Sequence, residues 1–327
     1  MTPEIKNIAV FTSGGDAPGM NAAVRAVVRA SIYYKKEIFG IYRGYEGMIE
    51  NDLVKLNARS VSNIIQRGGT ILKSARSKEF RTEEGRAQAY QHLKARHIDA
   101  LVAIGGDGTF TGLHKFYEEY KMPVICIPGT IDNDLAGTDY TIGYDTATNT
   151  AVDAIDKIRD TALSHNRLFF IEVMGRDSGQ IAINSGIAGG AVAIIIPEEE
   201  TTIDQLIEKL DETARNNKKS SLVVVAEGGK SGNALEIAQQ VKERYSYYDT
   251  KVTILGHLQR GGAPTYFDRV LASRMGVAAI EGLLQGETDV MVGIQNGKIV
   301  YNDFELTMSK EKEIEAEALR IAKILAI

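Results

Sequence analysis

Cysteine, tryptophan and long apolar runs are scarce in this chain of 327 residues, which has one cysteine and no tryptophan. The single cysteine, Cys126, excludes a disulfide framework, and its place in the apolar run 124–127 is typical of a buried structural thiol. No segment reaches the apolar length of a membrane span, and the first residues lack the basic and apolar parts of a signal peptide. We therefore expect a cytoplasmic protein that does not bind membranes.

A strong charge of one sign is lacking as well, because 38 Lys and Arg face 43 Asp and Glu, a net charge of −5. The basic residues are scattered along the chain, so the electrostatic footprint of a nucleic-acid-binding protein is missing. The hydrophobic fraction of 44% and the charged fraction of 25% are ordinary for a folded globular enzyme. The composition still allows the protein to bind small phosphorylated ligands through local clusters of basic residues.

Apolar, β-branched runs alternate with stretches of helical periodicity along the chain. The runs that predict buried strands are 8–11, 38–42, 100–104, 124–127, 168–173, 192–196, 222–225 and 252–255. The stretches that predict crossover helices are 20–36, 146–162, 203–216 and 268–284. This alternation predicts an α/β fold with mainly parallel sheets, and the length of the chain favours two compact lobes over a single core.

Glycine-rich or acidic turns follow several of the predicted strands, at residues 12–16, 105–108, 128–130 and 226–229. Ligands of open α/β sheets bind just beyond the carboxyl ends of the strands, where these turns fall. Gly15 and Gly108 each precede or open a predicted helix, so that backbone amides face any anion bound there. Asp107 adds a hard oxygen ligand suited to Mg²⁺ beside phosphates. Each glycine pair alone is equally consistent with a tight strand-to-helix turn.

A further phosphate-binding motif is incomplete. Gly228-Gly229-Lys230-Ser231 resembles the end of a Walker A loop, but the first glycine of that motif would fall on Val224, inside a predicted strand. We therefore interpret Lys230 as a solvated surface lysine.

Two carboxylates, Asp132 and Asp134, follow the Pro-Gly turn after the run 124–127. Read alone, they favour an Asx-type surface loop. Two other strand ends supply cations, since Arg176 follows one predicted strand, and His257 and Arg260 follow another. Carboxylates with planar cations indicate phosphoryl transfer to a phosphorylated alcohol.

Five motifs occur in one order over almost the whole chain. They are Ser13-Gly-Gly-Asp-Ala-Pro-Gly-Met-Asn, Gly105-Gly-Asp-Gly, Pro128-Gly-Thr-Ile-Asp-Asn-Asp, Glu172-Val-Met-Gly-Arg and Gly256-His-Leu-Gln-Arg-Gly-Gly. Together they resemble the bacterial-type ATP-dependent 6-phosphofructokinase family. The resemblance implies two Rossmann-like three-layer α/β/α domains with mainly parallel sheets and the active site in the cleft between them. It implies a larger ATP-binding domain at 1–144 and 259–307, and a smaller fructose 6-phosphate-binding domain at 145–258 and 308–327.

The reaction implied by this resemblance is Mg²⁺-assisted transfer of the γ-phosphoryl group of ATP to the 1-hydroxyl of fructose 6-phosphate, the committed step of glycolysis. Asp132 is the implied general base, and the other implied catalytic residues are Arg176, Arg76 and Thr130. The implied ATP contacts, with Asp107 also toward the metal, are Gly15, Tyr45, Arg76, Asp107, Gly108 and Thr109. The implied substrate contacts are Thr130, Asp132, Arg167, Met174, Gly175, Arg176, Glu227, Lys251, His257 and Arg260.

The resemblance also implies self-association and regulation. Arg167 matches a phosphate contact that family members donate from a neighbouring subunit, which implies a homotetramer. Lys251 stands where many relatives have a second such arginine. The basic positions that match the family's effector site for ADP or phosphoenolpyruvate are Arg25, Arg29, Arg159, Lys218 and Lys219. Ala58, Asn63 and Val192 depart from that site, so weak or altered allostery is an open alternative.

The phosphoryl donor is indicated by two glycines. Pyrophosphate-dependent relatives carry an aspartate at the position of Gly108 and a lysine at the position of Gly129. A carboxylate at position 108 would repel the α-phosphate of ATP, whereas glycine admits it. Both glycines predict ATP as the donor.

Three competing functions fit less well. NAD and lipid kinases share Gly-Gly-Asp-Gly but lack the motifs around Asp132 and His257. A nucleotide-binding regulator without catalysis would lack a catalytic carboxylate or arginine, yet Asp132, Asp107 and Arg176 are all present. A dehydrogenase of the Rossmann type needs G-x-G-x-x-G after the first strand, which this chain does not have.

Overall fold

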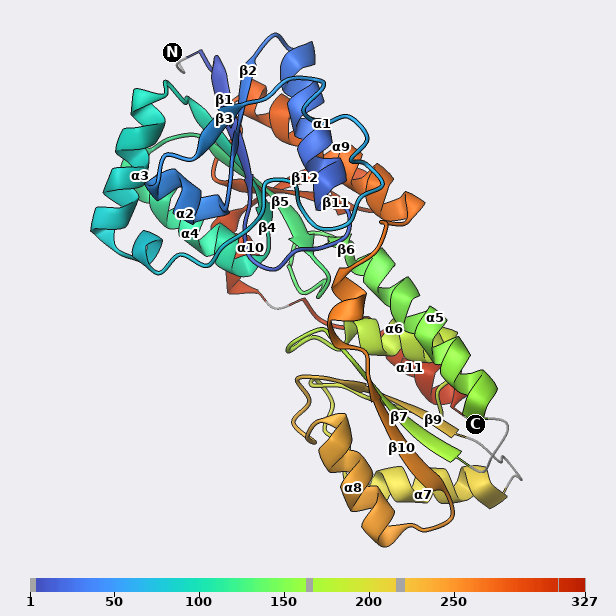
Figure 1. The fold of residues 1–327 in the computed structure, drawn as a ribbon. Coiled ribbons are helices and arrows are strands. Elements are labelled where there is room, and N and C mark those ends of the chain that lie inside the picture. Colours follow the sequence, from blue (N-terminus) through green and yellow to red (C-terminus); the bar gives the residue numbers. More distant parts are fainter. Residues whose placement is uncertain (1–3, 163–166, 216–220, 311, 327) are drawn as a thin grey trace. The chain divides into compact units, whose positions relative to one another are not determined.

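The computed structural model describes residues 4–162, 167–215, 221–310 and 312–326 (Figure 1). The chain divides into two compact units. Unit 1 consists of Met1–Ile131, Leu135–Asp145 and Arg260–Lys312, and unit 2 of Asp132–Asp134, Thr146–Gln259 and Glu313–Ile327. Two of the points at which the chain passes from one unit to the other therefore flank the short segment that contains Asp132 and Asp134.

Unit 1 is built on an eight-stranded sheet with the order β12-β11-β5-β4-β1-β2-β3, and β6 pairs with β5. Its strands are β1 (Asn7–Thr12), β2 (Glu37–Ile41), β3 (Leu53–Lys55), β4 (Ala100–Gly105), β5 (Val124–Thr130), β6 (Ile142–Gly143), β11 (Val290–Gln295) and β12 (Lys298–Asp303). Only the pairings at the two edges, β2 with β3 and β11 with β12, are antiparallel. The predicted mainly parallel sheet is confirmed.

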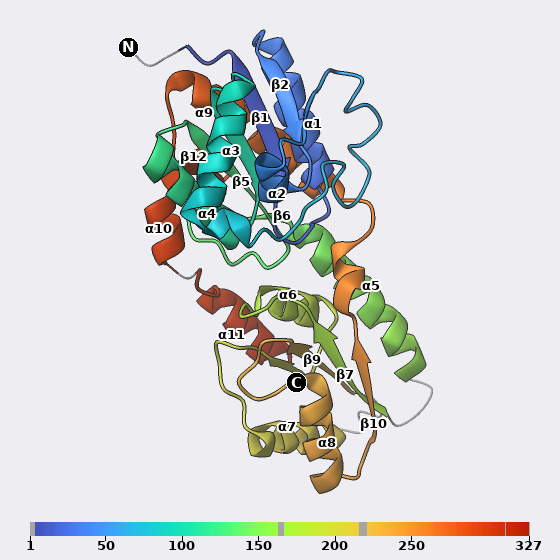
Figure 2. The same ribbon diagram turned by 60° about the vertical axis from the view of Figure 1, so that its left-hand side comes forward.

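Helices cover both faces of this sheet (Figures 1 and 2). The helices of unit 1 are α1 (Met20–Tyr33), α2 (Gly44–Ile49), α3 (Glu83–Ala95), α4 (Asp107–Tyr120), α9 (Tyr266–Gln285) and α10 (Phe304–Ser309). Phe110 and Phe116 of α4 and Leu93 of α3 share one buried cluster with Phe11 and Cys126 of the sheet. The long helices α1 and α9 pack closely together on the sheet, since a Cβ on Gly276 of α9 would lie only 2.6 Å from the Cβ of Ala26 on α1.

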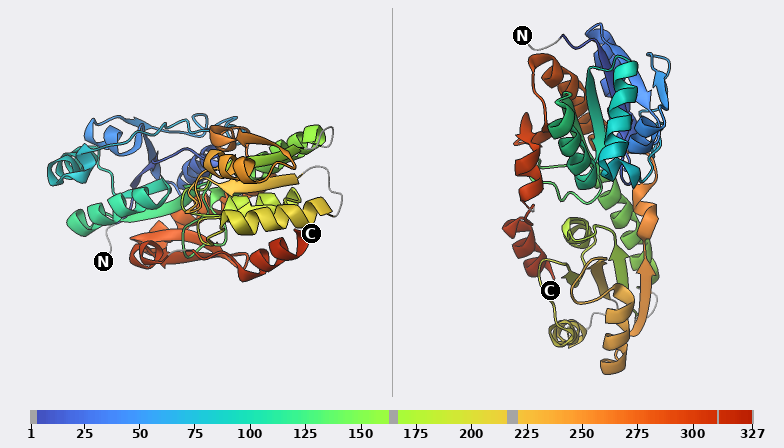
Figure 3. Two further views of the ribbon diagram at one scale, coloured as in Figure 1. Left: turned by 90° about the horizontal axis from the view of Figure 1, so that it is seen from below. Right: turned by 90° about the vertical axis from the view of Figure 1, so that its left-hand side faces the viewer.

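Unit 2 is built on a four-stranded, fully parallel sheet with the order β10-β7-β9-β8. Its strands are β7 (Arg167–Val173), β8 (Ala193–Ile195), β9 (Ser221–Ala226) and β10 (Asp249–Ile254), and its helices are α6 (Gln180–Ala188), α7 (Ile203–Arg215), α8 (Ala234–Arg244) and α11 (Ala316–Leu325). The helix α5 (Tyr144–Ala162) begins in unit 1 and continues into unit 2. The end-on and side views show helices on both sides of this sheet as well (Figure 3).

The predicted strands and helices are all present, with shifted ends. The run 252–255 covers only the end of β10, which starts at Asp249, because β10 is an edge strand whose residues alternate between exposed and half-buried. The hairpin of β11 and β12 and the short strands β3 and β6 were not predicted. No helix in the described part of the chain is both long enough and apolar enough to cross a membrane.

Candidate active site

The two glycine turns that were predicted to face phosphate lie side by side in unit 1. β1 and β4 are parallel neighbours, and beyond them the backbone N–H of Ser13 donates to the carbonyl of Ile104 at 3.0 Å. The chain leaves β1 toward β2 on one side and leaves β4 toward β5 on the other, so the strand order reverses between them. Ligands of open α/β sheets bind at such a switch point.

The first turn of α4 packs tightly against this point. A Cβ on Gly105 would collide with the hydroxyl of Thr109 and would lie 2.7 Å from the carbonyl oxygen of Ser13, so only glycine fits at position 105. A Cβ on Gly108, in contrast, would meet nothing within 4 Å. The same motif therefore contains one glycine that packing explains and one that faces open space.

Tyr45 contacts the same turn. Its ring stacks on Phe80 with the centroids 4.0 Å apart, and its hydroxyl donates to the carbonyl of Thr109. Burial raises the pKa of Tyr45 well above its usual value, so the hydroxyl keeps its proton as a donor. Tyr45 is buried, and its contact with the predicted nucleotide site runs through the backbone of Thr109.

Arg260 packs onto the first glycine turn. Its Nη1 donates to the carbonyl of Asp16 at 3.1 Å, and a Cβ on Gly15 would lie 2.5 Å from the same nitrogen. A residue predicted to bind ATP and one predicted to bind the sugar phosphate are thus in direct contact. Thr130, at the end of β5, lies close to the other turn, because a Cβ on Gly106 would be 3.6 Å from its Cβ.

Two charged residues of unit 1 that were predicted to contact ATP are exposed. The side chains of Asp107 and Arg76 are both exposed, and within the described ranges Arg76 makes no hydrogen bond or ion pair. No group of three or more histidine, cysteine, aspartate and glutamate side chains that could hold a metal occurs among the described residues. A Mg²⁺ ion at Asp107 would therefore take most of its ligands from phosphates and water, which is the usual arrangement for this ion.

The predicted base lies in unit 2 beside an arginine. Oδ2 of Asp132 is 3.6 Å from Nε of Arg176, and the exposed fractions of the two side chains are 3% and 62%. This separation is that of an ion pair rather than a strong hydrogen bond. The guanidinium offsets part of the cost of burying the carboxylate in its charged form.

The turn that carries Arg176 is held in place by residues that follow the neighbouring strand β9. Gly175 and Arg176 have φ values of 146° and 53°, in the region that favours glycine. Oε1 of Glu227 accepts hydrogen bonds from the backbone N–H groups of Gly175 and Arg176, at 3.3 and 2.9 Å. A Cβ on Gly228 would collide with the carbonyl oxygen of Arg176, which explains this glycine without a phosphate-binding role.

This positioning role of Glu227 was missed from the sequence. An acidic residue directly after a strand, next to a strand that ends in Met-Gly-Arg, was the available signal. The register that brings them together, Val173 opposite Ala226, depends on the order of the strands in the sheet. His257 lies beyond the neighbouring strand β10 and is exposed, so three adjacent strand ends carry the predicted sugar-phosphate contacts Met174, Gly175, Arg176, Glu227 and His257.

Arg167 and Lys251 are not part of this group. Both contact Asp249, with Nε of Arg167 3.6 Å and Nζ of Lys251 3.0 Å from its carboxylate, and Lys251, then Arg167, lowers the pKa of Asp249. Arg167 begins β7 and Val173 ends it. Six steps of about 3.3 Å place these two residues roughly 20 Å apart. Arg167 and Arg176 therefore lie toward opposite ends of β7.

The residues predicted to bind an effector are only partly described. Arg25 and Arg29 are one turn apart on α1, and burial, together with the charge of Arg29, lowers the pKa of Arg25. In unit 2, Nη2 of Arg159 donates to the carbonyl of Gly190 at 3.1 Å. Lys218 and Lys219 lie outside the described residues.

Comparisons with known proteins agree on one family. The family model described as "Phosphofructokinase" matches residues 7–283. The chain is 55% identical over 323 residues to "ATP-dependent 6-phosphofructokinase 2" of Bacteroides thetaiotaomicron, and this match covers 99% of each chain. It is also 55% identical over 323 residues to "ATP-dependent 6-phosphofructokinase 1" of Thermus thermophilus, covering 99% of this chain and all of the relative.

Solved structures show the same likeness. The structure of phosphofructokinase from Saccharomyces cerevisiae matches with a TM-score of 0.90 and 37% identity, over 98% of this chain and 48% of that chain. This chain thus spans about half the length of the yeast chain. A pyrophosphate-dependent phosphofructokinase from Marinobacter aquaeolei matches with a TM-score of 0.85 at 22% identity, a likeness of fold alone.

Proposed function

The chain belongs to the phosphofructokinase family, and we propose that it transfers the γ-phosphoryl group of ATP to the 1-hydroxyl of fructose 6-phosphate. The products are fructose 1,6-bisphosphate and ADP, and the reaction is a step of glycolysis. The observation that carries the proposal is the buried Asp132 beside Arg176, which joins a potential base to a potential phosphoryl-binding cation.

The covalent chain supports a joint role of the two units. Thr130 ends β5 in unit 1 and Asp132 belongs to unit 2, yet two residues of chain keep their Cα atoms within about 7 Å. Gln259 and Arg260 are likewise adjacent in sequence but belong to different units. The chain therefore joins Thr130 to Asp132, and Gln259 to Arg260, over at most two peptide steps.

Asp132 acts as the general base in this proposal. Its carboxylate takes the proton of the 1-hydroxyl while the oxygen forms its bond to the γ-phosphorus and the bond to the β-phosphate oxygen breaks. A nearby cation favours the ionised carboxylate, which is the form that accepts a proton. Arg176 and Arg76 offer donors to the equatorial oxygens of the transferring group, where one preorganised donor contributes about 3 to 4 kcal/mol.

The switch point of unit 1 supports ATP binding. The backbone around Gly15, Gly108 and Thr109 faces the phosphates, and Asp107 would hold Mg²⁺ together with them. When bound, Mg²⁺ neutralises charge on the phosphate oxygens. The open space at Gly108 supports ATP rather than pyrophosphate as the donor, because a carboxylate there would repel a third phosphate.

The strand ends of unit 2 support binding of the sugar phosphate. His257 offers a hydrogen-bond donor to the 6-phosphate, Arg260 of unit 1 adds a guanidinium, and Met174 and Gly175 line the sugar. Glu227 already uses Oε1 to hold the turn, which leaves Oε2 for a sugar hydroxyl. We propose that Arg167 and Lys251 complete the phosphate site of a second copy in a homotetramer, since Arg167 lies at the opposite end of β7 from Arg176 and both Arg167 and Lys251 contact Asp249.

A regulatory site is part of the proposal as well. Arg25 and Arg29 form a like-charged pair that an anion such as ADP or phosphoenolpyruvate would neutralise. The replacements Ala58, Asn63 and Val192 lead us to propose weakened or altered allostery.

One assay tests the reaction, the donor and the base together. Formation of fructose 1,6-bisphosphate is measured in a coupled assay with ATP or with pyrophosphate, for the wild type, Asp132→Asn and the control Asp153→Asn. Loss of the base predicts a fall in kcat of about 10²- to 10⁴-fold for Asp132→Asn. Asp153, exposed on α5 and paired with Lys157, predicts no change.

The outcomes separate the parts of the proposal. Activity with pyrophosphate but not ATP would refute the choice of donor. Wild-type kcat in a folded Asp132→Asn variant, as judged by circular dichroism, would refute the assignment of the base.

A further inference from the structure

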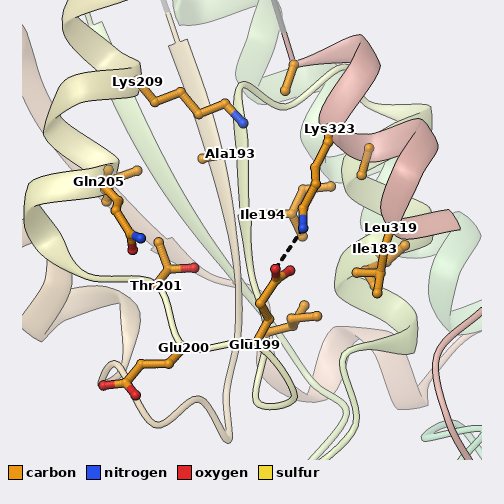
Figure 4. A pocket seen from close by; sticks show the side chains of 14 residues that line it. Ile183, Ala193, Ile194, Glu199, Glu200, Thr201, Gln205, Lys209, Leu319 and Lys323 are labelled. Carbon is orange, nitrogen blue, oxygen red and sulfur yellow. Dashed lines mark hydrogen bonds and ion pairs between the residues drawn. The ribbon is translucent and has the colours of Figure 1, made fainter. Parts of the chain in front are cut away.

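Unit 2 contains a hollow of about 270 Å³ that none of the proposed roles uses. It lies at β8, the outermost strand of the sheet, between α7 and the C-terminal helix α11 (Figure 4). A cavity of roughly 150 Å³ accommodates benzene in an engineered protein, so this hollow has room for a ligand of that size or larger.

The wall of the hollow has polar and apolar parts. Its apolar part is formed by Ile183 of α6, Leu206 of α7, and Leu319 and Ala322 of α11, with the strand β8 as its base. None of the residues of α11 is fully buried, although this helix packs against α6. An unfilled space beside an apolar helix face forfeits dispersion contacts, which a ligand with an apolar body would supply.

Two lysines extend into this space from opposite sides. Lys209 comes from α7 and Lys323 from α11, and the close view shows both reaching over β8 (Figure 4). Nζ of Lys323 is 2.7 Å from Oε1 of Glu199. Lys209 is half-buried, and among the described residues its side chain has no hydrogen bond or ion pair. The charge of Glu212, one turn along the same helix, stabilises this ammonium group without forming a salt bridge to it. Partial burial of the ammonium group remains costly, and a bound anion would offset that cost.

The balance of charge selects the kind of anion. Glu199 is paired with Lys323, and Glu200, which also lines the hollow, points away from Lys209 (Figure 4). Among the described residues that line the hollow, Lys209 is therefore the cation that has no salt bridge. A single carboxylate matches one ammonium group, whereas a dianionic phosphate would also meet the nearby carboxylate of Glu199. The hydroxyl of Thr201 on the rim offers a further donor to the anion.

We propose that this hollow binds a small monocarboxylate with an apolar chain, its carboxylate at Lys209 and its chain against α11. Strand addition by a peptide is disfavoured, because β8 has only three residues and helices flank it on both sides. Burial lowers the pKa of Lys209; the charge of Glu212 opposes this effect, and the charge of Lys323 adds to it. A bound carboxylate reverses that effect, so binding takes up protons and weakens as the pH rises through the pKa of Lys209.

The test is isothermal titration of the full chain with hexanoate, with saturating fructose 6-phosphate present to exclude binding at the proposed active site. We expect a dissociation constant on the order of 1 mM or lower, as ligand efficiencies of small molecules allow. Hexan-1-ol and hexylammonium, which have the same chain but no negative charge, should bind at least about tenfold more weakly.

Variants locate the site. Lys209→Gln should weaken hexanoate binding at least about tenfold, whereas Lys242→Gln, an exposed lysine on α8, should leave it unchanged. Ala322→Leu fills the hollow from α11 and should abolish binding without loss of secondary structure by circular dichroism.

Several results would overturn the proposal. The first is that hexanoate gives no heat of binding at 20 times the expected dissociation constant of about 1 mM. The second is that hexan-1-ol binds as tightly as hexanoate. The third is that the Lys209→Gln and Ala322→Leu variants both bind hexanoate as the wild type does. If one of the two variants fails to fold, the other decides.

Discussion

The substitution Gly108→Asp tests whether Gly108 faces the bound nucleotide, in contrast to Gly105 of the same motif, which packing requires to be glycine. A Cβ at this position meets nothing within 4 Å, and φ is not in the left-handed region, so the protein itself accepts a side chain there. Position 108 lies in the first turn of α4. Replacing glycine in a helix contributes about 0.5–1 kcal/mol, and an acid in the first turn about 0.3–1 kcal/mol. The free energy of unfolding should stay the same or rise by roughly 1–2 kcal/mol.

The effect on ATP binding should have the opposite sign. A carboxylate about 4 Å from one phosphate charge costs about 1 kcal/mol in bulk water and about 4 kcal/mol at an effective dielectric constant of 20. This range corresponds to a weakening of ATP binding of roughly 5- to 1000-fold. Because position 108 is exposed, we expect a value in the lower half of that range at physiological salt.

The assay compares KM for ATP and the urea midpoint of unfolding in the wild type, Gly108→Ala, Gly108→Asn and Gly108→Asp. The alanine variant tests whether there is room for a Cβ atom. The asparagine variant tests a side chain of the shape of aspartate without its charge, and the aspartate variant adds the charge. We expect KM for ATP to rise mainly between Gly108→Asn and Gly108→Asp, and we expect this increase to be smaller at high salt. An unchanged KM in a folded Gly108→Asp variant would show that position 108 does not face the nucleotide.

Two other predictions concern unit 2. Glu227→Ala removes the acceptor for the N–H groups of Gly175 and Arg176, so it should lower both kcat and the free energy of unfolding. Glu227→Gln keeps an acceptor and should lower both quantities less. Equal losses in the two variants would contradict the positioning role of Glu227. Lys251→Arg replaces a point charge by a fork that binds phosphate in two contacts, so KM for fructose 6-phosphate should fall about tenfold or less with kcat unchanged, and an unaltered KM would argue against a substrate role.

The two glycines that indicated ATP differ once their surroundings are known. A Cβ on Gly129 would lie 3.0 Å from Cγ2 of Ile104 and 3.1 Å from Cε of Met20, within the buried strand β5. Packing alone therefore favours a glycine at position 129, whatever the phosphoryl donor. The inference about the donor depends mainly on Gly108, which packing does not explain.

The alternation of strands and helices was readable from the sequence, because it depends on the spacing of apolar residues along short stretches of chain. The same holds for the turns at Gly15 and Asp107, where the chemistry is local. Sequence periodicity failed at β10, an edge strand in which no residue is fully buried and which therefore carries no continuous apolar run.

Only the tertiary structure decided what several of these residues contact. Gly105 and Gly228 are glycines because a hydroxyl and a carbonyl from other segments occupy the space of a side chain, and Gly108 is the one of these three that leaves room for a ligand. Glu227 holds the turn of Arg176 because β7 and β9 are neighbours, although about 50 residues separate them. Local patterns determine which elements form; the contacts between elements distant in sequence arise from packing, and these contacts separate structural glycines and acids from functional ones.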